Sequence, residues 1–394
     1  MNKNKTIDVL VFSAACHTAI NRKVFSDIMQ AGKTVVIAIP SELKFGSKVV
    51  RADMPKEGDP DIRFLKLNGY NARTNYFGGV FKIIRKYNPK NIVIDNDPAS
   101  IMVLQVAIFS KLINQAKLFC ISYENLSIAF LDSFSRRGFK SIIPYIYKKT
   151  FIFVNKKMIS GVFVVSNEGY KVFKSEGIKN VCKIPLGFDS NYFNIDNESR
   201  VEIRRHLEVN NKFTIGYFGR VSYEKGVHVL VEALSTLLKY DWVLLIDKFD
   251  RYQNHYANFI YDQIDNVGIS ERVIYSSPSH NEIGKFMNAV DVVVMPSLST
   301  PQWVEQYGRV APEAMACGKI VIASNTGAIP MLLNGYGILV DEENSIELAR
   351  KLEDIIIGGN GGLLSTPQEI SNYAHNSLNT IKQSSDMLNF MDSI

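Results

Sequence analysis

The sequence lacks the patterns by which several protein classes are recognised. Its cysteines are few and scattered, with no CxxC pair and no His/Cys cluster; they are Cys16, Cys120, Cys182 and Cys317. This argues against a zinc site or a disulfide framework and fits a reducing compartment. No stretch of 18 or more apolar residues is present, so we expect no membrane-spanning helix. The basic start of the chain precedes a short apolar run that predicts a strand and not a signal peptide, and we expect a cytoplasmic protein.

Acidic residues are also missing between Ser133 and Val165. The same stretch carries seven cations interleaved with apolar and aromatic side chains, namely Arg136, Arg137, Lys140, Lys148, Lys149, Lys156 and Lys157. Such a stretch is typical of a surface that lies on an anionic bilayer, where each cation contributes about 1 kcal/mol. Residues 134–157 therefore predict peripheral contact with the inner face of the cell membrane. The alternative is a core helix with a solvated basic face that grips an acidic acceptor.

Nucleic acid is not an expected partner of this chain. A formal net charge of +6 is mild for 394 residues, and no nucleic-acid-binding module is visible. A chain of this length should form two domains, each able to bury its own core. The hydrophobic content of 46% and charged content of 21% are those of a soluble globular protein.

Strand-like apolar runs alternate with helix-like segments through both halves of the chain. In the first half the runs are TIDVLVFSA (6–14), KTVVIAIP (33–40), NIVIDND (91–97), KLFCISYEN (117–125) and GVFVVSN (161–167). In the second half they are FTIGYFG (213–219), WVLLID (242–247), RVIYSS (272–277), DVVVMPS (291–297) and KIVIAS (319–324). Strands that alternate with helices predict a parallel, doubly wound α/β sheet in each half. The polar segment near 188–200 marks the join between the halves.

Two glutamates, Glu305 and Glu313, flank the entry to a short predicted helix. Pro312 suits its first turn, where no backbone N–H is required, and Gly318 suits its end, where a left-handed residue can stop it. A carboxylate in this position gains from the helix dipole and can accept hydrogen bonds from the hydroxyls of a ligand. The alternative is that both glutamates are solvated residues at the start of a helix, since acidic first turns are common.

The segment 213–234 predicts a strand, a short loop and an amphipathic helix. The strand ends at Gly219 and Arg220, and Lys225 lies in the loop just before the helix. A helix N-terminus favours anions through its free N–H groups, and nearby cations strengthen that preference. Arg220 can bind phosphate oxygens bidentately, while Lys225 acts as a mobile point charge. The alternative is a pair of ordinary surface cations.

Together these segments resemble the C-terminal half of a GT-B glycosyltransferase, and specifically the retaining enzymes of glycosyltransferase family 4 (glycosyl transferases group 1). The family pattern GR-x-x-x-x-KG falls on Arg220 and Lys225, which implies that they bind the donor diphosphate. The paired-glutamate motif implies that Glu305 faces the donor sugar and Glu313 the ribose. The same motifs put four neighbouring residues in the donor site, namely Gly219, Gly308, Arg309 and Val310. DVVVMPS (291–297), IPLGFDSNYF (184–193), SNTGAIPMLL (324–333) and GILV (337–340) also fit the family.

The resemblance implies a GT-B fold, in which two Rossmann-like, doubly wound α/β domains face an interdomain cleft. Residues 1–190 would form the acceptor-binding domain, and residues 191–370 the nucleotide-sugar-binding domain. A last helix, expected over about 368–392, would give a C-terminal segment 371–394 that packs back on the N-terminal domain. Ligands of such sheets bind beyond the carboxyl ends of the strands.

The acceptor side is less well defined than the donor side. The candidates are the polar residues that follow predicted strands, His17, Asp97, Glu124 and Asn125. Asp97 closes an Asp-Asn-Asp triplet, a form that binds a divalent metal in the other large glycosyltransferase fold, but here we interpret it as a polar loop at the end of a strand. His17 can contact the acceptor or be a satisfied polar residue near a helix start. Glu124 and Asn125 stand where the family often has a histidine, whose role does not transfer to them.

Two further departures from the family pattern concern the donor. The glycine-rich stretch usual after the second strand of the C-terminal domain is replaced by LLIDKFDRYQ (244–253), which leaves the base open, and Met331 replaces a glutamate often found in the distal loop. The expected reaction is transfer of a hexosyl group from a UDP- or GDP-sugar to a saccharide or lipid-linked acceptor in cell-surface glycan synthesis. The anomeric configuration would be retained, and no metal or other cofactor is expected. The catalytic residues would be Arg220, Lys225 and Glu305.

Two other classes of function stay open. One is a nucleotide-sugar epimerase or hydrolase of the same fold, which consumes the donor without an acceptor. The other is a non-catalytic subunit that binds a sugar nucleotide and supports a partner transferase. The presence of both the cation pair and the glutamate pair favours catalysis.

Overall fold

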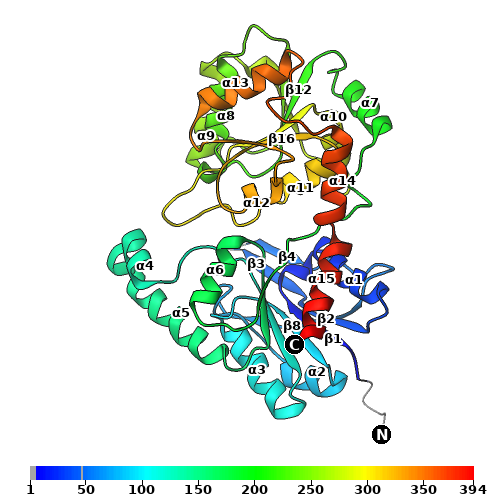
Figure 1. Cartoon of the computed structure of the whole chain (residues 1–394), viewed down its shortest axis with the longest axis vertical. Helices are drawn as coiled ribbons and strands as arrows, with labels where there is room; N and C mark the ends of the chain where they lie inside the picture. The colour runs from blue at the N-terminus through cyan, green and yellow to red at the C-terminus, as the bar shows by residue number, and fades with distance from the viewer. Residues whose placement is uncertain (1–5, 46–47) are drawn as a thin grey trace. The chain divides into compact units, whose positions relative to one another are not determined.

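The computed structural model describes residues 6–45 and 48–394, and the basic start of the chain, residues 1–5, lies outside them. The chain divides into two compact units (Figure 1). Unit 1 runs to Gly187 and resumes with Thr380–Ile394, and unit 2 is Phe188–Asn379.

Unit 1 contains a seven-stranded sheet in the order β11-β10-β9-β8-β1-β2-β5. Its strands are β1 (Val9–Ser13), β2 (Val35–Pro40), β5 (Asp61–Leu65), β8 (Asn91–Asp95), β9 (Lys117–Ser122), β10 (Gly161–Val164) and β11 (Val181–Lys183). All neighbours pair in parallel. Two small antiparallel pairs accompany it, β3 (Glu42–Phe45) with β4 (Lys48–Arg51) and β6 (Leu67–Asn68) with β7 (Tyr76–Phe77).

Helices cover both faces of this sheet. They are α1 (Lys23–Gln30), α2 (Val80–Tyr87), α3 (Ile101–Ile113), α4 (Phe130–Arg137), α5 (Ile142–Asn155), α6 (Asn167–Ser175) and α15 (Thr380–Ser393), with short 3-10 turns η1 (Ala15–His17), η2 (Ala19–Arg22) and η3 (Gly138–Ser141). Alternate residues of β1 point to opposite faces. Val9 and Val11 pack in a cluster with side chains of α1 and α15, whereas Leu10 and Phe12 pack with side chains of α2 and α3. The central strands are therefore largely apolar on both faces, as expected of a parallel sheet buried on both sides.

Unit 2 contains a six-stranded parallel sheet in the order β14-β13-β12-β15-β16-β17. Its strands are β12 (Phe213–Tyr217), β13 (Trp242–Asp247), β14 (Val273–Ser276), β15 (Val292–Met295), β16 (Ile320–Ser324) and β17 (Ile338–Val340). Its helices are α7 (Asn197–His206), α8 (Val227–Ser235), α9 (His255–Asn266), α10 (Ile283–Ala289), α11 (Val310–Ala316), α12 (Ile329–Leu333), α13 (Ser345–Ile356) and α14 (Pro367–Ser377), with 3-10 turns η4 (Tyr223–Lys225) and η5 (Ser270–Arg272). The expected doubly wound α/β sheet in each half is confirmed.

The strand order reverses once in each sheet. When only the strands of the large sheet of each unit are numbered in chain order, they follow the Rossmann order 3-2-1-4-5-6, with a seventh strand added at one edge in unit 1. The reversal lies between β1 and β8 in unit 1 and between β12 and β15 in unit 2. In open α/β sheets, ligands bind beyond the carboxyl ends of the strands at this point. The fold thus singles out the loops after these four strands.

The C-terminal region differs from the single helix expected over about 368–392. It forms two helices, α14 and α15, and the chain between them bridges back to the join between the units, where Phe188 pairs with Asn379. The first helix belongs to unit 2, since Ser371 Oγ donates a 2.7 Å hydrogen bond to the carbonyl of Ala316. Only α15 packs on α1, in unit 1 (red beside dark blue in Figure 1). The boundaries therefore fall after Gly187 and Asn379 and not at the expected 190 and 370.

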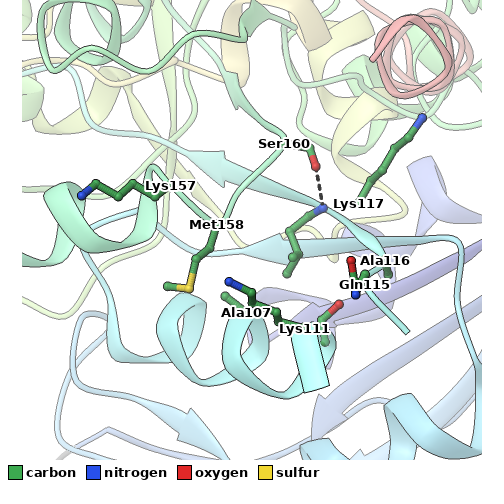
Figure 2. A pocket seen from close by; sticks show the side chains of 10 residues that line it. Ala107, Lys111, Gln115, Ala116, Lys117, Lys157, Met158 and Ser160 are labelled. Atoms are coloured by element: carbon green, nitrogen blue, oxygen red, sulfur yellow. Dashed lines mark hydrogen bonds between the residues drawn. The ribbon is translucent and has the colours of Figure 1, made fainter. Parts of the chain in front are cut away.

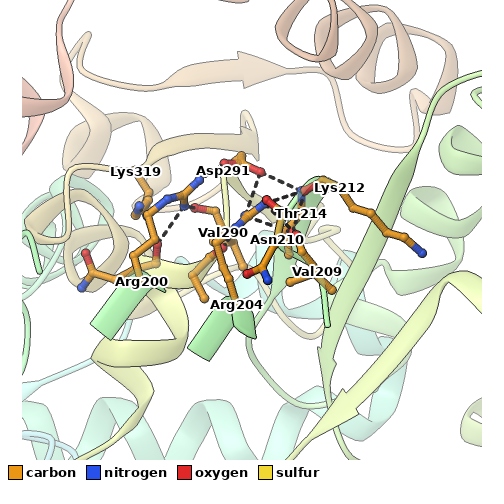
Figure 3. Close-up of polar contacts among 11 residues, drawn as sticks. Arg200, Arg204, Val209, Asn210, Lys212, Thr214, Val290, Asp291 and Lys319 are labelled. Atoms are coloured by element: carbon orange, nitrogen blue, oxygen red, sulfur yellow. Dashed lines mark hydrogen bonds and ion pairs between the residues drawn. The ribbon is translucent and has the colours of Figure 1, made fainter. Parts of the chain in front are cut away.

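A buried polar network ties α7 to the amino ends of the unit 2 strands (Figure 3). Asp291, just before β15, pairs with Arg200 and with Arg204, the latter at 3.3 Å, and accepts a 2.7 Å hydrogen bond from the Thr214 N–H. Arg204 also donates to the backbone carbonyl of Lys212 at 2.7 Å. A buried arginine is tolerated when its donors are satisfied in this way. The network stiffens the sheet at the edge opposite the candidate site.

Candidate functional site

The donor-side residues predicted from the sequence gather at the strand reversal of unit 2. Arg220 follows β12, while the loop after β15 carries Glu305 and leads into α11, which carries Glu313. Since β12 and β15 are adjacent and parallel, their following loops leave the sheet at the same edge. The two motifs, 80 residues apart at Lys225 and Glu305, therefore meet because of the strand order.

Lys225 and Glu305 form an ion pair at the centre of this region. Lys225 Nζ lies 2.6 Å from Glu305 Oε2, and the two side chains are 20% and 6% exposed. Ser297 Oγ donates to the same carboxylate oxygen at 2.9 Å. Both residues are thus held in one arrangement, and their charges neutralise each other in a largely water-excluded place.

Two close backbone approaches hold the loop between β15 and α11. A Cβ on Gly226 would lie 1.8 Å from the carbonyl oxygen of Pro296, and a Cβ on Gly327 would lie 2.0 Å from that of Glu305. Both glycines have positive φ, 66° and 53°, a backbone conformation that glycine adopts at little cost. The Ala328 N–H donates to the Glu305 carbonyl at 3.1 Å. The loop that carries Glu305 is therefore fixed from two sides by residues distant in the sequence.

Glu313 lies in the first turn of α11 and is only 6% exposed. Burial raises the pKa of its carboxyl from 4.5 to about 7, and the nearby Arg309 guanidinium opposes part of that rise. Glu305 is 5% exposed. The alternative that both glutamates are solvated is therefore wrong. Glu313 is a buried acceptor that gains when a ligand's hydroxyls satisfy it.

The other donor-side residues surround this pair. Arg220 is exposed, and its carbonyl accepts a 2.8 Å hydrogen bond from the buried Tyr217 hydroxyl. The Gly219 N–H donates to Asp247 at 2.8 Å, and burial raises the pKa of that carboxyl. Three residues form the turn into α11, with Gly308 before it, Arg309 at its N-cap and Val310 as its first residue.

Sequence patterns did not reveal several residues of the same loop. Trp303 lies beneath Lys225, whose Nζ is 5.1 Å from the centroid of its ring. Ser299 Oγ lies 2.6 Å from Thr326 Oγ1 and donates to Glu342 at 2.7 Å. Of these residues, only Trp303 could have been suspected from the sequence. It lies two residues before Glu305, and aromatic side chains often line binding sites.

Two of the predicted acceptor-side residues lie together in unit 1. Ser122 Oγ, at the end of β9, donates to Asp97 at 2.9 Å and accepts from the Glu124 N–H at 3.2 Å. Glu124 forms ion pairs with Arg73, at 3.3 Å, and with Lys148 of α5. Burial raises the pKa of Asp97. These residues form a structured polar cluster at the carboxyl edge of the sheet.

The remaining acceptor-side candidates are His17 and Asn125. His17 ends η1 and is half-buried, with Nδ1 3.2 Å from Thr18 Oγ1. Within residues 6–45 and 48–394, no hydrogen bond links His17 to Asp97 or Glu124. Asn125 follows Glu124 in the loop after β9 and is half-buried.

A cavity of about 250 Å³ lies elsewhere in unit 1, at the amino ends of β9 and β10 (Figure 2). It is lined by side chains that include Ser110, Lys111, Lys117 and Met158. None of the four acceptor-side candidates lines it. In Figure 2 the side chains of Lys117 and Lys157 extend away from the other labelled lining residues.

Within 6–45 and 48–394, no group of three or more His, Cys, Asp or Glu side chains is placed to hold a metal ion. Over the same residues, every helix is too short or too polar to cross a bilayer. All four cysteines are free thiols.

The family described as glycosyl transferases group 1 matches residues 199–377. The capsular polysaccharide biosynthesis glycosyltransferase CapM of Staphylococcus aureus is 29% identical over 233 residues, which are 56% of this chain and 57% of that protein. The D-inositol 3-phosphate glycosyltransferase of Paenarthrobacter aurescens is 32% identical over 154 residues, 37% of this chain and 36% of that protein. The chain thus spans less than two thirds of the length of these curated relatives.

Solved structures resemble the chain over nearly its whole length. Anabaena Alr3699/HepE, solved in complex with UDP and glucose, has a TM-score of 0.71 at 19% identity, over 98% of this chain and 100% of that one. A glycosyltransferase from Rickettsia africae has a TM-score of 0.72 at 19% identity, over 98% of both chains. At this identity the likeness shows the fold. Residues 199–377 thus match the glycosyl transferases group 1 family, and the two Rossmann-like units have the GT-B fold.

Proposed function

We propose that this protein is a retaining glycosyltransferase that moves a hexosyl group from a nucleoside diphosphate sugar to a saccharide or lipid-linked acceptor. The observation that carries the proposal is the buried cluster of Lys225, Glu305 and Ser297 at the strand reversal of unit 2. Arg220 and Glu313 emerge from the same edge of that sheet. A cation pair and two buried carboxylates in such a place suit a ligand with both a diphosphate and hydroxyl groups.

Cleavage of the bond between sugar and phosphate places negative charge on the departing diphosphate. Lys225 and Arg220 are the groups that stabilise this charge, and a fixed donor of this kind is worth roughly 100-fold or more in rate. Because the two cations take this part, no metal ion is required. Glu305 accepts hydrogen bonds from the sugar hydroxyls, and Glu313 accepts them from the ribose. The leaving phosphate itself takes the proton of the acceptor on the same face of the sugar, which retains the anomeric configuration.

The donor is most simply a UDP- or GDP-sugar. Among structural neighbours, Alr3699/HepE was solved with UDP-glucose, which supports testing UDP-sugars first. The acceptor belongs to cell-surface glycan synthesis, in keeping with the capsular polysaccharide biosynthesis for which CapM is named. In unit 1, Asp97 and Glu124 lie at the carboxyl edge of the sheet, where they can accept hydrogen bonds from acceptor hydroxyls, with His17 and Asn125 in neighbouring loops.

The protein works at the inner face of the cell membrane, held there by the surface of α4, η3 and α5. No residue of α4 is buried, and three large apolar side chains project from this surface, since Leu131 is 77% exposed and Phe139 and Ile143 are each 81% exposed. Arg137 and Lys140 lie beside them in sequence. Apolar side chains among cations are the features that bind a soluble protein to an anionic bilayer.

Not every cation of 134–157 serves this surface. Lys149 pairs with Glu176 at 2.6 Å, and Lys148 pairs with Glu124. These two lysines of α5 therefore stabilise unit 1, and the bilayer contact depends on the α4–η3 end of the segment.

The test is a panel of UDP-, GDP-, ADP- and TDP-sugars in EDTA, scored for thermal stabilisation and for slow hydrolysis of the donor. One donor should give both, and Glu305→Gln should lose the hydrolysis. Glu353→Gln serves as the matched control, because Glu353 is a carboxylate of the same unit that also pairs with a lysine, Lys239. No response to any nucleotide sugar would overturn the proposal.

Other outcomes separate the competing functions. Stabilisation without turnover, even with candidate acceptors present, would indicate a non-catalytic binding subunit. Consumption of the donor with no glycoside formed in the presence of acceptor would indicate an epimerase or hydrolase. Inversion of the anomeric configuration in a glycoside product would contradict the retaining mechanism.

A further inference from the structure

Trp303 provides an aromatic face for the ammonium group of Lys225. The distance from Nζ to the centroid of the ring is 5.1 Å, within the range of a cation–π contact. On another side, the same ammonium lies 2.6 Å from Glu305 Oε2. Lys225 is thus held between a ring and a carboxylate that come from one loop.

The backbone of Trp303 is held tightly for a loop residue. Its N–H and carbonyl pair with Thr300 across a two-residue turn, with N···O distances of 3.2 Å and 2.7 Å. Thr300 Oγ1 also accepts from the Trp303 N–H at 3.0 Å. Pro301 takes the second position of this turn, which its fixed φ favours. The ring is therefore presented by a stiff hairpin and does not depend on a flexible loop.

This arrangement limits the directions in which Lys225 can bind a ligand. A lysine ammonium has three N–H donors. One is directed to Glu305 Oε2, and the Trp303 ring centroid lies 5.1 Å from the same nitrogen. A diphosphate that approaches Lys225 meets the donors that these two contacts leave, on a side chain that is only 20% exposed, so the attraction is less screened than in open water.

Lys225 needs the contact with Trp303 because the hydroxyls of the donor sugar compete with it for Glu305. When Glu305 turns to the hydroxyls of the donor sugar, its hold on Lys225 weakens at the moment when the lysine must bind the diphosphate. The lysine stem is flexible and has many rotamers. A contact that does not involve Glu305 keeps the ammonium in place through this exchange.

We propose that Trp303 is a positioning residue of the donor site, which holds Lys225 toward the donor diphosphate through its ring while Glu305 engages the sugar. This inference rests on the proposed function, because it assigns Lys225 to the diphosphate. It adds a requirement specific to this chain, namely that binding of a diphosphate depends on an aromatic ring at position 303.

The test measures binding of inorganic pyrophosphate in EDTA by titration calorimetry. Pyrophosphate carries the charges of the donor diphosphate without any choice of base or sugar. Trp303→Leu keeps an apolar side chain but removes the ring, and should weaken binding about threefold to thirtyfold, the range expected for a partly desolvated cation–π contact. Trp303→Phe keeps a ring and should restore most of the affinity.

A double-mutant cycle with Lys225→Met separates positioning from general damage to the loop. If Trp303 acts through Lys225, then Trp303→Leu should change the affinity less than twofold in the Lys225→Met background. Phe153→Leu is the matched control, because the Phe153 ring lies 4.3 Å from Lys157 Nζ in unit 1 and its loss should leave the affinity unchanged. Thermal unfolding of each variant reports whether unit 2 is intact.

The outcomes distinguish the inference from the function on which it rests. If the unmodified protein does not bind pyrophosphate, the diphosphate site itself is wrong. If it binds and Trp303→Leu binds equally well, or loses the same factor with and without Lys225, only the role of Trp303 is overturned. Equal weakening by Trp303→Phe and Trp303→Leu would likewise contradict a role for the ring.

Discussion

Glu313 is expected to destabilise the protein at neutral and alkaline pH. Its folded-state pKa is about 7, against an ordinary value of 4.5. Each pKa unit corresponds to about 1.4 kcal/mol, so ionising this buried carboxyl costs the folded state about 3 kcal/mol. The cost is offset only in part by the nearby Arg309 guanidinium, which lowers the pKa of this carboxyl. We predict that Glu313→Gln, which removes the charge and keeps the shape, stabilises unit 2 by up to this amount at pH 8.5.

The pH dependence of the effect follows from the direction of the pKa shift. Since the folded pKa lies above the unfolded one, the folded protein binds more protons between pH 4.5 and pH 7. The contribution of Glu313 to stability therefore falls as the pH rises through this window, and it is constant above it. Glu313→Gln should have little effect at pH 4.5, with its gain growing from pH 5 to pH 7 and then levelling off.

The measurement is thermal unfolding of the variant and the unmodified protein side by side from pH 5 to pH 8.5. For a unit of this size, about 3 kcal/mol corresponds to roughly 6–12 °C in Tm. Glu369→Gln is a useful control, because hydrogen bonds from Thr366 lower the pKa of that carboxyl, so its pH dependence should have the opposite sign. A gain at Glu313 that does not change with pH, or a loss at pH 8.5, would refute the reasoning.

Two further predictions test the placement of the loops. Gly327→Ala should reduce donor hydrolysis at least tenfold, because its Cβ would lie 2.0 Å from the Glu305 carbonyl. Gly335→Ala is the control and should be active, because Gly335 also has a positive φ but no atom lies within 4 Å of its Cβ. Equal losses of activity in the two variants would contradict the clash. A double substitution of Phe139→Asp with Ile143→Asp should abolish co-sedimentation with anionic vesicles while Tyr70→Asp, at a fully exposed tyrosine, leaves it intact. Binding that survives the double substitution would contradict membrane contact through this surface.

The buried strands of both sheets could be predicted from the sequence because each contains a continuous apolar run. WVLLID, for example, forms β13 (Trp242–Asp247) over the whole of the expected range. The edge strand β5 (Asp61–Leu65) was missed since it mixes exposed and buried residues, and its pairing with β2 depends on a partner distant in the sequence. Local pattern therefore sufficed for the buried strands and failed for the partly exposed edge strand β5.

The break in the C-terminal helix shows the same limit. The start of α14 has a local signature, since Thr366 and Glu369 form a capping box, a pattern that sequence alone can give. Its end has none, because the helix stops where Asn379 bridges to Phe188, nearly 200 residues away. The Phe188 N–H donates to the carbonyl of Leu378 at 3.1 Å, so a long-range contact ends the helix and sets the boundary between the units.

The candidate site, too, could be predicted from the sequence only in part. Arg220 and Lys225 share one short segment, as do Glu305 and Glu313, so the spacing within each pair could be recognised. Only the family resemblance placed the two pairs in one site, because their meeting depends on β12 lying next to β15, an adjacency that chain order does not reveal.

The residues that support the site were hidden for a related reason. Ser297 and Gly327 lie in segments that resemble the family, but the sequence does not show what they contact. The structure shows the hydrogen bond from Ser297 to Glu305 and the 2.0 Å approach of a Gly327 Cβ to the Glu305 carbonyl. Short segments of sequence thus reveal the groups that would contact the donor. The groups that hold them, Trp303 included, emerge from contacts between segments, and the substitutions at Trp303 and Gly327 therefore test what the structure adds to the sequence.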